Sequence, residues 1–412
     1  MTPSIIRAPA ASSITEFEPL LPRDSNLQPL LELAHILQKH CWTLAGNPMP
    51  GLHRSLTPLL RAMNSYYTNK IEGQHTLPAD IENALKNEFS KNPDKAKRQR
   101  LAIAHLDTEK WAEETFSPLG WRNAFNPETV SGLHRHLYRL LPEVDRITDT
   151  GEPVCEGEFR DKGVIVGLHL APTPESVPDF LKRWYEFYGS QPAGERALVG
   201  IACSHQRLAW VHPFRDGNGR VARLQSHIAL HAMGLTNGLW SPMRGLARKQ
   251  QEYYDRLSDA DEIRQGDYDG RGALSEQGLI RFVTFFLEIC IDQVTFMESM
   301  LNLADFKERL DALLTFESTR EKSAIRREAL YPLHYIAING AMERGEFKSM
   351  TGLADRTAER LLKGLLDFGL LKSDTPKGKI YFWIPLNSLR FLFPSLWPEA
   401  EAAIKKKDVD SI

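Results

Sequence analysis

Several features that mark other classes of protein are scarce or missing in this sequence of 412 residues. It has four cysteines, Cys41, Cys155, Cys203 and Cys290, without Cys-x-x-Cys spacing, which argues against a disulfide framework or a zinc site. The formal net charge of −2 gives no bulk attraction to nucleic acid or membranes. No apolar run approaches the roughly 20 residues that span a bilayer, and residues 1–16 lack the pattern of a signal peptide. We therefore expect a cytoplasmic protein with reduced thiols and no membrane partner.

The densest polar cluster in the chain is the stretch 212–223, which reads His-Pro-Phe-Arg-Asp-Gly-Asn-Gly-Arg-Val-Ala-Arg. Apolar and small residues recur at steps of three and four on both sides of it, as they do on one face of a helix. The recurring positions are Ala197, Ile201, Ser204, Leu208 and Val211 before the cluster, and Val221, Leu224, His227, Ile228 and Met233 after it. The pattern predicts a helix–loop–helix with the reactive groups in the loop.

The glycines and arginines of this loop suit an anion. Gly217 and Gly219 bracket an asparagine, so we expect left-handed backbone there and a concavity of N–H groups. A helix that begins near Gly219 or Arg220 would point its free N–H groups at the same place. Arg220 and Arg223 add guanidinium groups that match phosphate oxygens. We infer a polyphosphate site.

Three other residues of the loop have chemistry of their own. A neutral His212 at the mouth of the anion site can take a proton from a hydroxyl, and such general-base help accelerates a reaction roughly 10²–10⁴-fold. Asp216 can hold a divalent cation that bridges phosphates. Phe214 is apolar and is expected to anchor the loop in the core. Taken singly, a histidine before proline and an Asp-Gly-Asn-Gly run are ordinary turn features; together they indicate a site.

At every specified position this stretch matches the signature His-x-Phe-x-Asp/Glu-Gly-Asn-Gly-Arg-x-x-Arg, and the chain resembles the Fic family. The resemblance implies an all-helical core that transfers AMP from ATP to a hydroxyl of a protein, itself included, and releases pyrophosphate. It also implies that His212 deprotonates the target and that Asp216 binds Mg²⁺. By the same resemblance the Gly-Asn-Gly backbone holds phosphates and Arg223 meets the γ-phosphate.

An earlier stretch matches a second motif of the family, Ser/Thr-x-x-x-Glu-Gly/Asn. Residues 68–73 read Thr-Asn-Lys-Ile-Glu-Gly, with Thr68 and Glu72 at the defining positions. Where this motif precedes the core, the resemblance implies an autoinhibited enzyme. A carboxylate paired with Arg223 would occupy the donor that the γ-phosphate needs. Without the 212–223 motif, Glu72 would read as an exposed residue at a helix end.

Two further segments are expected near the nucleotide. The β-branched run after Gly163 predicts a hairpin, and the resemblance implies a flap there whose edge pairs with an extended target. Tyr253 and Tyr254 match a Tyr-Tyr-x-x-Leu segment that relatives place beside adenine and ribose, although they could equally be packing residues. Asp261 stands where many relatives have asparagine. The full set predicted to bind the nucleotide is Glu72, Val166, Gly167, His169, Phe214, Arg215, Asp216, Gly217, Asn218, Gly219, Arg220, Arg223, Tyr253 and Tyr254.

We expect a mainly α fold: a helical Fic core with a β-hairpin flap, and a C-terminal winged helix-turn-helix. Helices are predicted over residues 27–44, 54–67, 127–141, 177–188 and 276–300, and residues 1–24 are expected to form an irregular arm on the body. The predicted domains are an N-terminal helical region over 1–115 with the inhibitory motif, a catalytic core over 116–305, a winged helix over 320–395 and a tail over 396–412, which we expect to be solvated after Pro398.

Other functions remain open on the sequence alone. Glu72 could instead position a water that removes AMP from a modified protein. The chain could also be a DNA-binding regulator, since Arg356, Arg360 and Lys363 share one face of the second helix of the winged unit. Acidic neighbours dilute that face, so we favour a protein-docking or dimerising role for this unit, and a homodimer is a conceivable partner.

Overall fold

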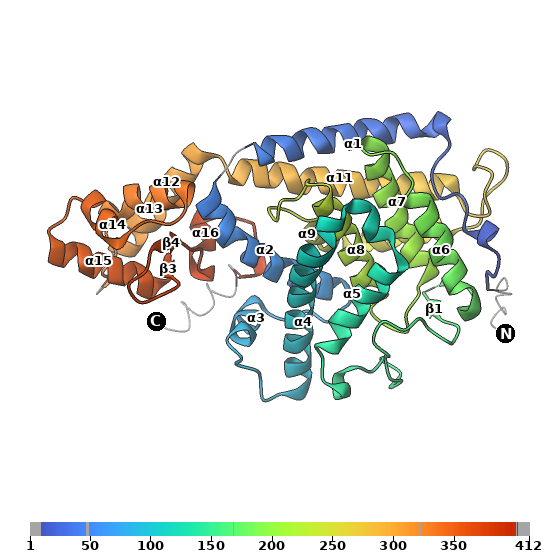
Figure 1. Cartoon of the computed structure of the whole chain (residues 1–412), viewed down its shortest axis with the longest axis horizontal. Helices are drawn as coiled ribbons and strands as arrows, with labels where there is room; N and C mark the ends of the chain where they lie inside the picture. The colour runs from blue at the N-terminus through green and yellow to red at the C-terminus, as the bar shows by residue number, and fades with distance from the viewer. Residues whose placement is uncertain (1–9, 47–48, 168, 322, 401, 403–412) are drawn as a thin grey trace.

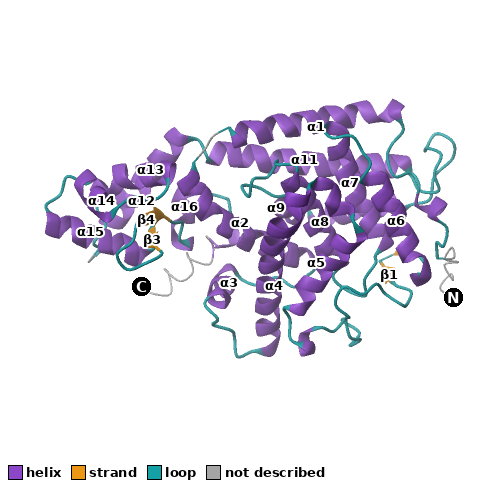
Figure 2. Ribbon diagram, in the orientation of Figure 1, coloured by secondary structure: helices purple, strands orange, loops and turns teal. Residues whose placement is uncertain are grey.

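The computed structural model describes residues 10–46, 49–167, 169–321, 323–400 and 402. Figure 2 shows that helices make up most of it, as the sequence predicts. The longer helices are α1 (Asp24–Ala45), α2 (Pro50–Ile71), α3 (Pro78–Leu85), α4 (Pro93–Phe116), α5 (Pro127–Arg139), α6 (Val177–Tyr188), α7 (Glu195–Val211), α8 (Asn218–Ala232), α10 (Gln250–Asp261), α11 (Glu276–Met300), α12 (Leu303–Ser318), α13 (Leu330–Asn339) and α15 (Asp355–Phe368). The short ones are α9 (Met243–Arg248), α14 (Arg344–Met350) and α16 (Leu389–Leu392).

The helix pair α7 and α8 forms the centre of the molecule. Nearly every side chain of α7 is buried, and so is nearly all of α8, because neighbouring helices cover these two on all sides. Helices α1 and α11 run side by side along one edge in Figure 1, and both pack against α7. The expected N-terminal arm lies on this body, with Phe17 and Leu20 buried. The motif loop is therefore held between two immobilised helices.

A short hairpin precedes α6, where the sequence predicts it. Strand β1 (Ile165–Val166) pairs antiparallel with β2 (His169–Leu170), with Val166 opposite His169. Within the described residues β1 pairs only with β2, so its other edge has no strand partner. Both side chains of β1 are exposed.

Two helices and a hairpin lie in the C-terminal part of the chain, where the sequence predicts a helix-turn-helix and a wing. Helix α15 buries Ala358, Leu361, Leu362 and Leu365 and ends at Gly369, whose left-handed backbone closes the helix. Strands β3 (Leu371–Ser373) and β4 (Ile380–Phe382) form an antiparallel hairpin after it. The basic side chains Arg356, Arg360 and Lys363 are exposed.

This unit is packed against helix α2 rather than standing apart from the rest of the chain. Arg54 of α2 pairs with Asp374 at 3.1 Å, and its guanidinium lies 3.5 Å from the ring centroid of Tyr381. At Gly51, a Cβ would collide with the carbonyl of Ile336 in α13, so only glycine allows this close approach. In Figure 1 α2 runs from this end of the molecule toward α8.

The tail predicted over 396–412 begins with packed residues, and the expectation that it is solvated after Pro398 is wrong for Glu399 and Ala400. Trp397 and Ala400 are buried, and the Trp397 ring packs on Tyr66 with centroids 5.7 Å apart. The carboxylate of Glu399 accepts from the Tyr67 hydroxyl at 2.8 Å and from Lys70 at 3.0 Å. Side chains of α2 hold this segment, and the nearby lysine run concealed these contacts in the sequence. Residues 403–412, including Lys405 to Lys407, lie outside the described part of the chain. None of the described helices combines the length and apolar character needed to cross a bilayer.

Candidate active site

The loop between α7 and α8 is held in shape by its own side chains. His212 ends α7 in a left-handed conformation, with φ 48° and ψ 61°. Phe214 is fully buried and stacks on the His134 ring at 3.9 Å, as an anchor would. The Asn218 side chain accepts from the N–H of Phe214 and donates to its carbonyl, both at 2.8 Å. The loop therefore presents His212 from a rigid turn.

The two glycines of the loop differ in function. Gly217 is left-handed, with φ 80°, and a Cβ there would lie 2.8 Å from the Tyr138 hydroxyl. The expectation that Gly219 is also left-handed is wrong, because α8 already begins at Asn218 and Gly219 is helical. Glycine is required there for space: a Cβ would collide with Oε1 of Glu72.

No side chain caps the first turn of α8, so its N–H groups are free to meet an anion. The anion that lies there is the carboxylate of Glu72, at the end of α2. Its Oε1 lies 2.5 Å from Nη2 of Arg223. The same guanidinium donates to the Thr68 hydroxyl at 2.7 Å and to the Thr68 carbonyl at 3.2 Å. Burial alone would raise the pKa of Glu72, but Arg223 and Arg220 outweigh it and hold this pKa below its usual value.

Further contacts hold the end of α2 in this position. The carbonyl of Ile71 accepts from the side chains of Gln250 at 2.8 Å and Tyr254 at 2.6 Å. Tyr254 therefore contacts the segment 68–73 directly. The Tyr253 hydroxyl is buried and lies 2.7 Å from Nε2 of His205, which makes this side chain part of the core. Nucleotide contacts of either tyrosine stay predictions.

Asp216 has the surroundings of an ionised carboxylate. Its Oδ2 accepts from the Tyr138 hydroxyl at 2.7 Å and lies 4.0 Å from Arg220. His134 holds its backbone, with Nε2 3.2 Å from the Asp216 carbonyl. Burial raises the pKa of Asp216, but Arg220 and the Tyr138 hydroxyl bring it below the usual value. The side chain keeps 38% of its surface exposed, so it remains accessible to a cation.

His212 is placed as a neutral base. The pKa of its imidazole is lowered to about 4, mainly by burial; His169 and Arg160 also lower it, whereas the hydrogen bond with the Ala209 backbone and the charge of Glu72 oppose them. An imidazole with this pKa is uncharged at neutral pH and can accept a proton. His169 comes from the hairpin and lies with Nε2 2.7 Å from the Trp210 carbonyl.

The remaining predicted residues lie around this centre. Val166 is exposed on β1, and Gly167 turns the hairpin with φ 60°. Arg215 pairs with Asp161 at 2.5 Å in the loop before the hairpin. Arg220 donates to the side chain of Gln74 at 2.9 Å, while its buried Nε has no hydrogen-bond partner among the described residues.

Sequence reasoning missed Arg160. This side chain is only 3% exposed, and it donates from Nε to the carbonyl of His212 at 2.8 Å. A lone arginine at the start of a predicted hairpin shows no pattern that would single it out. The only local signal is that it follows Phe159, which packs near Phe214.

A buried cluster behind α8 has metal-binding residue types. Carboxylate and imidazole atoms of Glu109, Glu113 and His227 lie within 4.8 Å of one another. Arg61 also pairs with Glu113, and Glu109 and Glu113 hold the pKa of His227 above its usual value although burial lowers it. Burial raises the pKa of Glu109 to about 7, and both Arg61 and His227 pair with Glu113, so the side chains of this cluster partner one another without an ion. We therefore assign this cluster a structural role, which is to hold α2, α4 and α8 together.

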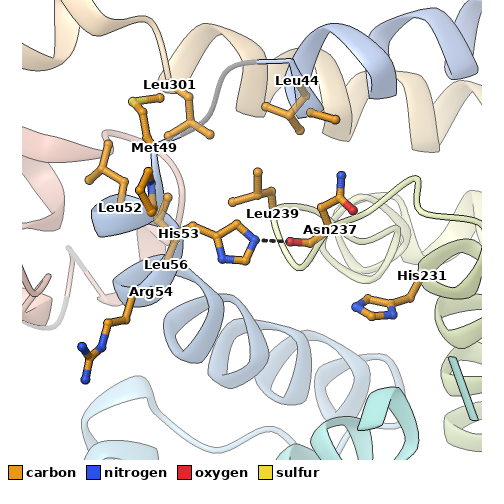
Figure 3. A pocket seen from close by; sticks show the side chains of 12 residues that line it. Leu44, Met49, Leu52, His53, Arg54, Leu56, His231, Asn237, Leu239 and Leu301 are labelled. Carbon is orange, nitrogen blue, oxygen red and sulfur yellow. Dashed lines mark hydrogen bonds between the residues drawn. The ribbon is translucent and has the colours of Figure 1, made fainter. Parts of the chain in front are cut away.

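A cavity of about 640 Å³ lies at the opposite end of α2 from Glu72 (Figure 3). Its lining includes five leucines, and the His53 ring bonds to the Asn237 carbonyl at 2.5 Å. Since α2 has 22 residues and a helix rises about 1.5 Å per residue, this cavity is far from the motif loop. It is not the anion site.

Comparison with known proteins agrees with this site. Residues 124–230, from just before α5 to near the end of α8, match the model of the Fic/DOC family, so this part of the chain is a Fic/DOC domain. The protein adenylyltransferase Fic of Drosophila mojavensis is 30% identical over 138 residues, which cover 33% of this chain and 26% of that protein. The one of Drosophila ananassae is 32% identical over 221 residues, 52% of this chain and 41% of that protein. The chain thus spans between about a quarter and two fifths of the length of these relatives.

A solved structure resembles the whole fold. A Fic family protein from Desulfovibrio desulfuricans G20 superposes with a TM-score of 0.51 at 18% identity, covering 89% of this chain and 98% of that one. At this identity the likeness shows the fold alone. The helical architecture around the motif is therefore shared with a Fic protein.

Proposed function

We propose that this chain is a Fic-type protein adenylyltransferase, which transfers AMP from ATP to Ser, Thr or Tyr hydroxyls of proteins, including its own, and which Glu72 holds inactive. One observation carries the proposal. A carboxylate lies over the first turn of α8, against Arg223, in a space that Gly219 leaves open. That space has the donors and the charge to hold a phosphate group.

The reaction needs a base, an anion cradle and a place for the target. A neutral His212 takes the proton of the hydroxyl, whose oxygen attacks the α-phosphorus while the bond to the β-phosphate oxygen breaks. The N–H groups at the start of α8, with Arg220 and Arg223, bind the phosphates and stabilise the charge that develops on them. Proton transfer and charge stabilisation thus come from one loop and one helix end.

The residues present also fit a magnesium ion. Mg²⁺ is usually held by one or two carboxylates together with substrate phosphates, and Asp216 offers an accessible, ionised carboxylate beside the cradle. When bound, the ion would neutralise phosphate charge. Tyr138, by donating to Oδ2, fixes the orientation of Asp216 and leaves Oδ1 for the ion.

The contact between Glu72 and Arg223 accounts for autoinhibition. While Nη2 of Arg223 donates to Glu72 and Thr68, the Glu72 carboxylate occupies the space beside Gly219 that a γ-phosphate would take. ATP would then bind in a pose that does not align its α-phosphorus with the target hydroxyl. Release of Glu72 restores the guanidinium to the nucleotide.

The free edge of β1 suits an extended segment of the target. An added strand would gain main-chain hydrogen bonds with little demand on sequence. The exposed side chains of Ile165 and Val166 offer apolar contact on that strand. This mode of binding would bring the hydroxyl toward His212, because His169 of the same hairpin bonds to Trp210 near the end of α7.

Removal of AMP is a second candidate. The observation that favours it is that Glu72 is ionised and close enough to influence the imidazole of His212. A carboxylate there could orient a water for attack on an AMP–protein bond. The test is to incubate an AMP-modified protein with the chain as it stands and, separately, with its Glu72→Gly variant. Loss of AMP with the first and not with the second supports removal.

Mass spectrometry of the modified proteins tests the proposal. Purified Glu72→Gly protein, given ATP, Mg²⁺ and a protein extract, should gain the mass of AMP on hydroxyl side chains and release pyrophosphate, whereas Glu72→Gly with His212→Ala should not. Absence of modification from both proteins, with extract present, contradicts AMP transfer.

A further inference from the structure

Arg160 is a buried cation with no part in the steps described above. Its guanidinium donates from Nε to the carbonyl of His212 at 2.8 Å and from Nη2 to the carbonyl of Val211 at 3.4 Å. The backbone N–H of Arg160 also donates to the carbonyl of Pro213 at 2.9 Å. Three consecutive carbonyls at the end of α7 are thus held by one residue.

The same side chain reaches both arms of the hairpin. Nη1 donates to the carbonyl of Lys162, before β1, at 3.0 Å. Nη2 donates to the carbonyl of Pro172, after β2, at 2.5 Å. Arg160 therefore joins the base of the hairpin to the turn that carries His212.

This arrangement holds a backbone conformation that needs support. His212 is left-handed, which is uncommon for a residue with a Cβ and persists where the surroundings enforce it. The direction of the imidazole follows from that backbone. Fixing the His212 carbonyl from outside the loop is a direct way to enforce it.

The charge of Arg160 matters as well as its hydrogen bonds. All four acceptors of its guanidinium are backbone carbonyls, and no carboxylate is among them. Burial lowers the pKa of Arg160 to about 10, against the influence of Glu175, so it remains a cation at neutral pH. A cation beside His212 disfavours a second positive charge on the imidazole.

We propose that Arg160 is a positioning residue for His212, which fixes the direction of the base through the backbone and keeps the base uncharged. This role deepens the proposed transfer reaction and rests on it. Two substitutions separate the two effects. Arg160→Lys keeps the charge and loses the fork of donors, whereas Arg160→Gln loses the charge.

The first measurement does not depend on AMP transfer. The imidazole of His212 is titrated by NMR in the otherwise unmodified chain with labelled histidine, and its signal is identified from a His212→Ala sample. The groups facing this ring are His169 on the hairpin, Glu72 at the end of α2 and Arg160 itself. The pKa of His212 should rise in Arg160→Gln and stay unchanged in Arg160→Lys. Arg122→Gln, which removes a guanidinium bonded to the Gln191 carbonyl elsewhere, is the matched control and should change nothing.

The second measurement is kinetic, in the Glu72→Gly background. Misplacement of a catalytic group by about 1 Å can cost about 10²-fold, so kcat should fall by about that factor in both Arg160 variants while KM for ATP changes little. An unshifted His212 titration in Arg160→Gln overturns the electrostatic part, and full kcat in a folded Arg160→Lys overturns the positioning part. If Arg160→Gln does not fold, the lysine variant decides alone. If the Glu72→Gly parent transfers no AMP yet His212 still responds to Arg160→Gln, the proposed function fails and the link between these two residues stands.

Discussion

Replacing Glu72 by glycine should activate the enzyme by a factor that the structure bounds. In the structure Arg223 makes three hydrogen bonds to the end of α2, and the substitution removes the one to the Glu72 carboxylate. A hydrogen bond to a charged group contributes about 1.5–3 kcal/mol, and each 1.4 kcal/mol corresponds to about tenfold in a population ratio. We therefore expect the transfer rate to rise by roughly 10- to 10²-fold.

The substitution itself should cost the fold little. Glu72 lies just beyond the end of α2, at a helix terminus where glycine is well tolerated. The assay is the initial rate of AMP incorporation at saturating ATP and Mg²⁺. Glu88→Gly, at an exposed glutamate after α3, is the matched control and should leave the rate unchanged. Glu72→Gln keeps the size but not the charge and should give an intermediate rate.

Two results would refute this reasoning. One is a folded Glu72→Gly protein whose rate stays within twofold of the unmodified chain. The other is equal activation by Glu88→Gly, which would trace the effect to the general loosening of the region rather than to Arg223.

Three further outcomes follow from the same geometry. The pKa of His212 is lowered to about 4, and only the neutral ring acts as a base. The rate of AMP transfer by the Glu72→Gly protein should therefore stay constant from pH 8 to about 5. A fall in rate with a midpoint near pH 6.5, the ordinary pKa of histidine, would contradict this. Asp216→Asn should lower the rate by at least about 10²-fold and raise the Mg²⁺ concentration needed, because a neutral amide is a poorer ligand for a hard cation; an unchanged Mg²⁺ titration would remove Asp216 from the ion site. Glu399→Gln breaks the ion pair to Lys70. A loss of about 1 kcal/mol in the stability of this contact should make backbone hydrogen exchange at the end of α2 about fivefold faster. Unchanged exchange would mean that the C-terminal segment does not stabilise this helix.

Much of the helical frame was predictable because periodic apolar patterns reflect burial. The helices predicted over 177–188 and 276–300 are observed with those bounds, and α15 buries the face expected of it. Strong periodicity between clear breaks needs no tertiary information. The hairpin was also predictable, because its β-branched run lies between glycines.

What depends on contacts between distant segments was not predictable. The sequence shows that Gly219 is needed in the motif, but only the approach of Glu72 shows that the need is for space. Similarly, His212 is left-handed as well as Gly217, which a histidine before proline does not reveal. Arg160 gains its importance only when the hairpin meets the end of α7. The docking of Trp397 on α2 depends on contact with Tyr66, more than 300 positions away in the sequence.

The central claim is that the chain moves the AMP part of ATP onto protein. Its most direct test compares ATP labelled at the α-phosphorus with ATP labelled at the γ-phosphorus, using Glu72→Gly protein with and without His212→Ala. The account predicts that protein retains the α label, that the γ label leaves with pyrophosphate, and that His212→Ala abolishes labelling. Transfer of the γ label instead, or α labelling that persists without His212, would contradict it.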